Sequence, residues 1–254
     1  MTPYYDDGVR RIYHGDAEEV LATLCAAGEI FDVAVTSPPY NMGLSPGGNG
    51  RGMYRPGADN KGGKFRHGYH ESHDDAMPWP EYDAWQRRCI TAMLGVTRLG
   101  VYYNHRSRVI HGRLRLPLDG RYDDLPLRQM IVWDRGTGID VNVRHYCTAH
   151  ELILLFTHDD FRLVDHAASG ISDVWRLGMN HDAATAEHPA PFPKQLPARA
   201  IVTTGATSIL DPFCGSGSTL RAAADAGIRG VGVDASERYC EIAAKRLAQA
   251  SLFG

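Results

Sequence analysis

The chain has 254 residues, of which 43% are hydrophobic and 22% charged, and its formal net charge is −3. These values are typical of one globular domain, and no apolar run reaches the roughly 18 residues that a membrane-spanning helix needs. Because the opening MTPYYDDGVRR also lacks the apolar stretch of a secretory signal, we expect a single cytoplasmic domain over residues 1–254 with no membrane segment.

Two elements are predicted ahead of residue 37. A capping-box pattern at Asp16 and Glu19, followed by apolar residues on one face, predicts a helix from Asp16 to Gly28. Phe31–Thr36 (FDVAVT) is almost wholly apolar, which is typical of a strand covered on both faces. The tetrapeptide Ser37-Pro38-Pro39-Tyr40 ends this strand abruptly, and functional residues often lie at such a strand end.

A glycine-rich segment occupies the next part of the chain. Residues 43–68 hold nine of the 27 glycines, so we predict a long mobile loop over residues 43–79. A helix is then expected to start near Pro80. Short apolar runs predict three further strands, at Leu99–Tyr103, Met130–Trp133 and Leu152–Phe156.

The last fifty residues show the clearest order of elements. They predict a strand, a helix, a second strand and a closing helix, at Ser208–Asp211, Ser218–Ala226, Gly230–Asp234 and Ser236–Ala250. The first three form a βαβ unit. Together with the earlier strands, this unit predicts an α/β fold with a mostly parallel sheet and helices on both faces.

The turn after the first of these strands is the first candidate binding site. The sequence from Asp211 to Ser218, DPFCGSGS, places two glycines between a strand and a helix, where backbone N–H groups can approach a ligand. No lysine follows, and Leu220 replaces the third glycine of the dinucleotide fingerprint. Asp234 ends the next strand, where it can accept hydrogen bonds from ribose hydroxyls. A nucleoside ligand is predicted, and a purely structural turn is the alternative.

The tetrapeptide is the second candidate site. Its prolines fix the backbone and leave the carbonyl groups of Ser37 and Pro38 free to accept hydrogen bonds, which suits a ligand with an NH2 group. Tyr40 adds an aromatic face on which a flipped base can stack. The alternative is a rigid turn with a core tyrosine.

Taken together, SPPY and DPFCGSGST resemble the catalytic and cofactor motifs of amino-directed DNA methyltransferases that use S-adenosylmethionine, in the permuted class where the tetrapeptide precedes the cofactor loop. The resemblance covers nearly the whole chain and includes HGD at His14–Asp16, HPAPFPKQLPARAI at His188–Ile201 and GVGVDASERYCEIAAKRL at Gly230–Leu247. IVWDR near Trp133 and AHELILLFT near Glu151 are similar to later strands of the family. The implied fold is the Rossmann-like methyltransferase fold.

The resemblance also implies roles for individual residues. The catalytic residues would be Ser37, Pro38, Pro39 and Tyr40. In the cofactor site, Asp211, Gly215 and Gly217 would line the methionine part, Asp234 the ribose and Asp16 the adenine, with Phe213 packed over the ligand. Lys194 would lie near the cofactor carboxylate, or else on the surface at the start of a helix. No metal site is predicted.

The first residue of the tetrapeptide bears on the target base. Among relatives, serine here goes mainly with cytosine N4 and aspartate mainly with adenine N6, so we predict transfer to cytosine N4, with adenine N6 as the alternative. A cytosine-C5 enzyme is disfavoured because its Pro-Cys dipeptide is absent. An RNA or protein methyltransferase and a non-catalytic scaffold are the remaining rivals.

Contacts with double-stranded DNA are expected from basic residues outside these two motifs. The loop over residues 43–79 is expected to close over DNA, with phosphate contacts from Arg51, Arg55, Lys64 and Arg66. Residues 134–150 and 159–187 are candidate target-recognition elements, and such a small recognition region is consistent with a homodimer. We expect Trp133, Trp175 and Tyr146 to be packing residues.

Overall fold

The computed structural model describes residues 1–41, 74–136, 138, 145–178 and 192–251. Its helices are α1 (Ala17–Ala26), α2 (Trp79–Gly95), α3 (His166–Ser169), α4 (Gln195–Thr204), α5 (Ser218–Asp225), α6 (Glu237–Ser251) and the 3₁₀ helix η1 (Pro117–Gly120). Its strands are β1 (Tyr5–Asp6), β2 (Arg10–His14), β3 (Phe31–Thr36), β4 (Thr97–His105), β5 (Arg108–Ile110), β6 (Arg113–Arg115), β7 (Leu127–Asp134), β8 (His150–Thr157), β9 (Val174–Arg176), β10 (Ser208–Asp211) and β11 (Arg229–Asp234).

Nine of the strands in the described ranges form one sheet, in the order β1-β2-β11-β10-β3-β4-β8-β7-β9. The central strands β2, β11, β10, β3 and β4 are all parallel, and β9 is parallel to β7. Antiparallel pairing is found between β1 and β2, between β4 and β8, and between β7 and β8. The sheet is therefore mostly parallel, as the sequence predicts, and the carboxyl ends of five neighbouring strands meet at one edge.

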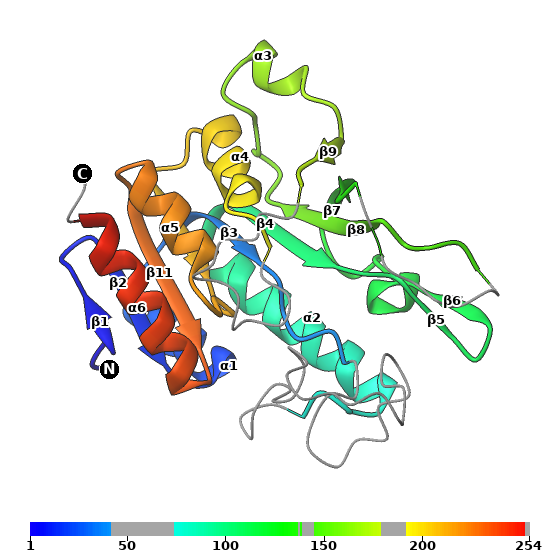
Figure 1. The fold of residues 1–254 in the computed structure, drawn as a ribbon, viewed down its shortest axis with the longest axis horizontal. Helices are drawn as coiled ribbons and strands as arrows, with labels where there is room; N and C mark the ends of the chain where they lie inside the picture. The colour runs from blue at the N-terminus through cyan, green and yellow to red at the C-terminus, as the bar shows by residue number, and fades with distance from the viewer. Residues whose placement is uncertain (42–73, 137, 139–144, 179–191, 252–254) are drawn as a thin grey trace, which may run out of the picture.

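Helices cover both faces of this sheet because alternate residues of each central strand point to opposite sides. Ala34 of β3 belongs to the apolar cluster formed with α1 and α2, whereas Val33 and Val35 belong to the cluster formed with α4 and α5. A third cluster joins α6 to β2 and α5. Figure 1 shows α4, α5 and α6 side by side along one face. The predicted α/β fold with helices on both faces is confirmed.

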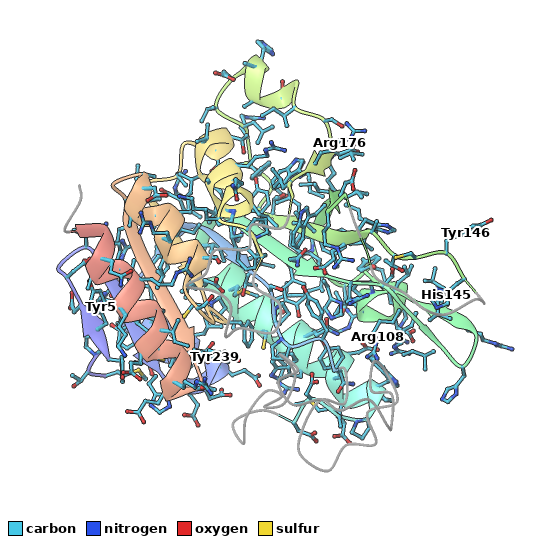
Figure 2. The ribbon with its side chains drawn as sticks, in the orientation of Figure 1. Tyr5, Arg108, His145, Tyr146, Arg176 and Tyr239 are labelled. Atoms are coloured by element: carbon cyan, nitrogen blue, oxygen red, sulfur yellow. The ribbon has the colours of Figure 1, made fainter. Side chains whose placement is uncertain are left out.

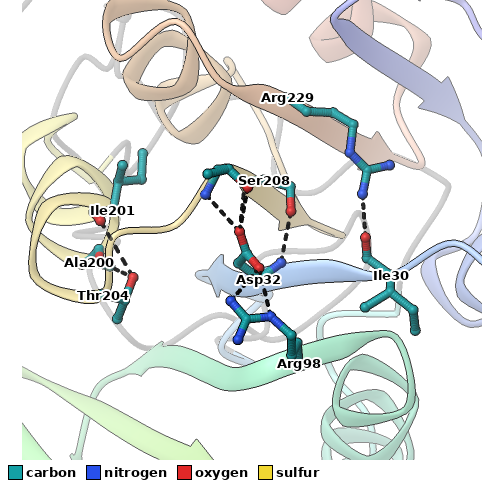
Figure 3. Close-up of polar contacts among 9 residues, drawn as sticks. Ile30, Asp32, Arg98, Ala200, Ile201, Thr204, Ser208 and Arg229 are labelled. Carbon is teal, nitrogen blue, oxygen red and sulfur yellow. Dashed lines mark hydrogen bonds and ion pairs between the residues drawn. The ribbon is translucent and has the colours of Figure 1, made fainter. Parts of the chain in front are cut away.

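The amino ends of three strands are joined by a polar cluster around Asp32 of β3 (Figure 3). Asp32 Oδ2 accepts hydrogen bonds from the backbone N–H and hydroxyl of Thr207, at 2.7 and 2.8 Å, and from the Ser208 N–H at 3.2 Å. Arg98 of β4 donates to Asp32 Oδ1 at 2.8 and 3.0 Å. Burial raises the pKa of Asp32, but the hydrogen bonds from Thr207 and Arg98 outweigh it and leave that pKa lowered.

The predicted elements are found with small shifts at their ends. Asp16 is the N-cap of α1 and its side chain accepts hydrogen bonds from the N–H groups of Glu18 and Glu19, which is the capping role that the sequence indicates. β2, the β5–β6 hairpin and β9 were not predicted, and α4 was indicated only through the alternative helix start at Lys194, which is its N-cap. In the described part of the chain, no helix is long and apolar enough to span a membrane.

Candidate active site at the carboxyl edge of the sheet

The two predicted motifs follow neighbouring parallel strands. β3 leads into Ser37–Tyr40 and β10 leads into the glycine turn, and these strands pair directly. The last residue of β3, Thr36, donates a hydrogen bond from its hydroxyl to Asp211 Oδ1 over 2.7 Å. The tetrapeptide and the glycine turn, 175 residues apart in sequence at this contact, therefore begin side by side.

Asp211 is a fully buried carboxyl group without a cationic partner among the described residues. Besides Thr36, it accepts hydrogen bonds from the Thr219 hydroxyl at 2.6 Å and from the Phe213 N–H at 3.1 Å. Burial raises the pKa of Asp211 to about 6, and these hydrogen bonds offset only part of that effect. The site thus holds an acidic group whose charge is not neutralised by any cationic residue in the described part of the chain.

Asp234, at the end of β11, is the second acidic group of the site. Its carboxylate accepts hydrogen bonds from the Gly215 N–H at 2.9 Å and from the Ser236 N–H at 2.8 Å. Burial raises the pKa of Asp234 to about 6, and the hydrogen bonds from Ser236 and Gly215, with a smaller contribution from His14, offset part of this effect. The strand end and the glycine turn are therefore directly connected.

The glycine turn depends on two left-handed residues. Gly215 has φ +49° and Gly217, the N-cap of α5, has φ +81°. A Cβ atom on Gly217 would lie 2.9 Å from the Cβ of Ala243 in α6. Only glycine therefore allows the turn and the close packing of these two helices at once.

The remaining predicted cofactor residues differ in their placement. Asp16 follows β2 at the same edge, where the Gly15 N–H donates to the Asp234 carbonyl at 3.1 Å. The Phe213 ring lies edge-on to Trp85 of α2, with centroids 5.5 Å apart. Lys194 is exposed, and its Nζ pairs with Asp225 at 2.7 Å. Since Asp225 ends α5 and Gly217 begins it, the structure does not bring Lys194 together with the glycine turn.

Three of the four tetrapeptide residues are buried, and Ser37 is partly exposed. The Ser37 and Tyr40 hydroxyl oxygens are 2.6 Å apart. Tyr40 is 7% exposed, and its ring lies 4.7 Å from that of His105 at the end of β4. The Tyr82 hydroxyl of α2 donates to the Pro39 carbonyl at 2.5 Å. The turn is thus fixed by its neighbours, with only the serine open to solvent.

Sequence reasoning missed two polar residues that contact Tyr40. Asn104 of β4 donates from Nδ2 to the Tyr40 hydroxyl oxygen at 2.7 Å and to Glu151 Oε2 at 2.8 Å. The Tyr40 hydroxyl lies 3.1 Å from the same Glu151 oxygen. Asn104 Oδ1 is buried and accepts from no described residue. The contacting residues are 47 to 111 positions apart in sequence, so no local motif links them. The only sequence signal for Asn104 and Glu151 was that each lies near the end of an apolar strand.

Other predicted residues fall elsewhere. Arg51, Arg55, Lys64 and Arg66 lie outside the described residues, as do most of the 43–79 loop and parts of the 134–150 and 159–187 segments. Trp133 and Trp175 are buried as expected. The expectation for Tyr146 was wrong, since this side chain is 97% exposed and lies at the periphery of the molecule (Figure 2).

The chain belongs to the N6/N4 DNA methylase family, whose match spans residues 31–245. It is similar to the type II methyltransferase M.ScaI of Streptomyces caespitosus, with 24% identity over 96% of this chain and 83% of that protein. The structure of the PvuII DNA methyltransferase (cytosine-N4-specific) covers 98% of this chain and 92% of that one, with a TM-score of 0.69 and 17% identity. The M1.HpyAVI–SAM complex covers 93% and 99%, with a TM-score of 0.59 and 18% identity.

Membership of this family identifies the enzyme class of the protein. The chain is a DNA methyltransferase, its target is cytosine N4 or adenine N6, and its cofactor is S-adenosylmethionine. The predicted fold class, the enzyme class and the cofactor are confirmed. DNA is the substrate, which sets aside the RNA and protein alternatives.

Proposed function

We propose that this enzyme transfers a methyl group to N4 of a flipped cytosine in double-stranded DNA and that Ser37–Tyr40 is its catalytic tetrapeptide. The observation that supports this most is the Thr36–Asp211 hydrogen bond, which puts the start of the tetrapeptide beside the start of the glycine turn. Because SPPY precedes DPFCGSGST in the sequence, the order of motifs fits the permuted class. The alternative target, adenine N6, presents the same kind of exocyclic amine.

The residues around the glycine turn suit S-adenosylmethionine, which supplies a methyl group on a positively charged sulfur. Asp211 and Asp234 are acidic groups with raised pKa values, so a cationic ligand with hydroxyl groups would favour their ionised forms. We assign Asp211, Gly215 and Gly217 to the methionine part, Asp234 to the ribose and Asp16 to the adenine. Phe213, held against Trp85, would cover the ligand.

The tetrapeptide would hold the target amine through acceptors. Ser37 Oγ and the Pro38 carbonyl would each accept an N–H bond, which weakens the conjugation of the nitrogen lone pair with the base and makes it a better nucleophile. Alignment of two bound reactants supplies a large part of such a rate enhancement, on the order of 7–11 kcal/mol.

The biological setting is proposed by analogy with relatives. M.ScaI and M2.DpnII are named type II methyltransferases, so we propose a role in restriction–modification. Phosphate contacts by Arg51, Arg55, Lys64 and Arg66 stay a prediction from the sequence. A homodimer also stays a prediction, which light scattering of the purified protein tests.

The test of the proposed function is nucleoside mass spectrometry of duplex DNA incubated with the protein and S-adenosylmethionine. We expect N4-methylcytosine, and finding only N6-methyladenine would refute the proposed base. Ser37→Ala should lower kcat by about 10²-fold or more, because one acceptor aimed at the reacting amine is lost. Glu241→Gln, which breaks an exposed ion pair on α6, is the matched control and should leave transfer unchanged.

A further inference from the structure

A buried carboxylate lies behind the tetrapeptide and touches its tyrosine. Glu151 of β8 is 7% exposed, and its Oε2 lies 3.1 Å from the Tyr40 hydroxyl and 2.8 Å from Asn104 Nδ2. Its other oxygen, Oε1, pairs with Arg135 at 3.2 Å. Glu151 belongs to neither the tetrapeptide nor the glycine turn. Its polar contacts within the described residues are with Tyr40, Asn104 and Arg135, and none of these lies in the glycine turn.

The chemistry of these groups fixes the direction of each hydrogen bond. A carboxylate can only accept, so both the Asn104 N–H and the Tyr40 O–H point toward Glu151 Oε2. A tyrosine hydroxyl has one proton, and in this arrangement that proton is committed to Glu151. The 2.6 Å contact between Tyr40 and Ser37 must then use the serine proton, with Tyr40 as the acceptor.

The orientation of Ser37 follows from this chain of hydrogen bonds. Asn104 Nδ2 also lies 3.4 Å from Ser37 Oγ. However, its shorter bonds to Tyr40 and Glu151 use both of its protons. With its own proton turned inward to Tyr40, Ser37 Oγ keeps its lone pairs for a donor from outside, and Ser37 is the tetrapeptide residue that is partly exposed. Without an acceptor at position 151, the Tyr40 proton can turn to Ser37 Oγ instead. It would then occupy a lone pair that an incoming N–H group needs.

We propose that Glu151 is a positioning residue, which acts through Tyr40 to make Ser37 an acceptor for the exocyclic amine of the target base. This inference rests on the proposed role of Ser37 and deepens it. Asn104 supports the same direction, since its second N–H donates to the Tyr40 oxygen and leaves the Tyr40 proton for Glu151. Glu151 itself is not expected to touch the substrate.

The test is a double-mutant cycle of Glu151→Gln with Tyr40→Phe, read as kcat for methyl transfer to duplex DNA. The glutamine keeps the size of the side chain, but its amide can donate to Tyr40 and reverse the chain of hydrogen bonds. We expect Glu151→Gln to lower kcat by about 10²-fold, with the KM for DNA and the Kd for S-adenosylmethionine each changed by less than about threefold. Glu151→Asp, which keeps an acceptor-only group, should restore part of kcat.

The Tyr40→Phe background separates positioning from a structural role. Phenylalanine keeps the ring but removes the hydroxyl through which Glu151 acts, so Glu151→Gln should cost less than about threefold there. Equal losses in both backgrounds, or a wild-type kcat in Glu151→Gln, would overturn the proposal. If Glu151→Gln does not fold, Tyr40→Phe alone must lower kcat at unchanged cofactor affinity, and a wild-type kcat there would also overturn it. A wild-type protein that transfers no methyl group to DNA would instead refute the proposed function.

Discussion

The pKa of a buried carboxyl group is shifted in opposite directions at the two ends of the central strands. At the amino end, Asp32 of β3 meets two backbone N–H groups, a hydroxyl and the guanidinium of Arg98, and its pKa is lowered. At the carboxyl end, Asp211 of the neighbouring β10 meets two hydroxyls and one N–H, and burial raises its pKa to about 6. The fold therefore supplies Asp32 with a cationic partner, whereas Asp211 has none among the described residues.

We therefore expect the carboxyl group at the amino end to contribute to stability and the one at the carboxyl end to contribute to ligand binding. A carboxylate with a full set of donors stabilises the pairing of β3, β4 and β10, so the amino end needs no ligand. The carboxyl end keeps two acidic groups close together, since the charge of Asp234 also raises the pKa of Asp211. Such an arrangement costs stability until a cation binds, which is typical of a binding site.

Within this comparison of the two strand ends, the largest expected effect comes from removing the charge at the carboxyl end. Asp211→Asn should weaken S-adenosylmethionine binding by about 30-fold, which corresponds to about 2 kcal/mol for a lost charge-assisted hydrogen bond. The fold should tolerate the amide, because Thr219 can redirect its hydroxyl to the Val35 carbonyl, already 3.4 Å away. Isothermal titration calorimetry measures the affinity. Unchanged binding would show that Asp211 is structural, like Asp32.

The same substitution at the amino end should have the opposite result. Asp32→Asn loses the ion pair with Arg98 and should lower the free energy of unfolding by roughly 1–2 kcal/mol, a modest value because the Arg98 side chain is 57% exposed. Denaturant titration measures this change. Cofactor affinity should stay at the wild-type value, and a loss of affinity larger than about threefold would contradict the separation of the two ends.

The sequence predicts the central strands well because strands buried on both faces are rich in apolar residues. Phe31–Thr36 and Ser208–Asp211 are covered on both faces, and their central residues are apolar. β2 was missed because RRIYH begins with two arginines, one of which, Arg11, pairs with Glu29. For α4, only a start at Lys194 was indicated, because Pro197 interrupts the apolar pattern of the helix. Proline is nevertheless tolerated in the first turn of a helix.

The candidate site was predicted in part for a related reason. Its motif residues, such as Ser37 and Asp211, are recognisable because they cluster at strand ends in short, unusual sequences. Asn104 and Glu151 lie near the ends of largely apolar strands, and only the pairing of β4 with β8 brings them to Tyr40. A single polar residue in such a strand gives no indication of its partner before the strand order is known.

The smallest expected effect is the slope of stability against pH, which should differ between the two variants. The folded-state pKa of Asp211, about 6, lies above its ordinary value of 3.8, so its contribution to stability is complete below about pH 4 and is lost as the pH rises through 6. Asp32 has a lowered pKa, so its contribution is present above about pH 4 and is lost as the pH falls further.

Between pH 4 and pH 7.5, the stability of Asp211→Asn relative to wild type should therefore improve by roughly 2 kcal/mol in total, which is less than about 1 kcal/mol per pH unit. The relative stability of Asp32→Asn should stay constant over that range and improve only below it, because the wild type then loses the benefit of the ionised carboxylate. Denaturant titrations of all three proteins from pH 3 to pH 7.5 measure these slopes, and the shared groups, such as His105, cancel in the differences. Parallel profiles for the two variants would mean that the two ends of the strands do not differ in their electrostatics.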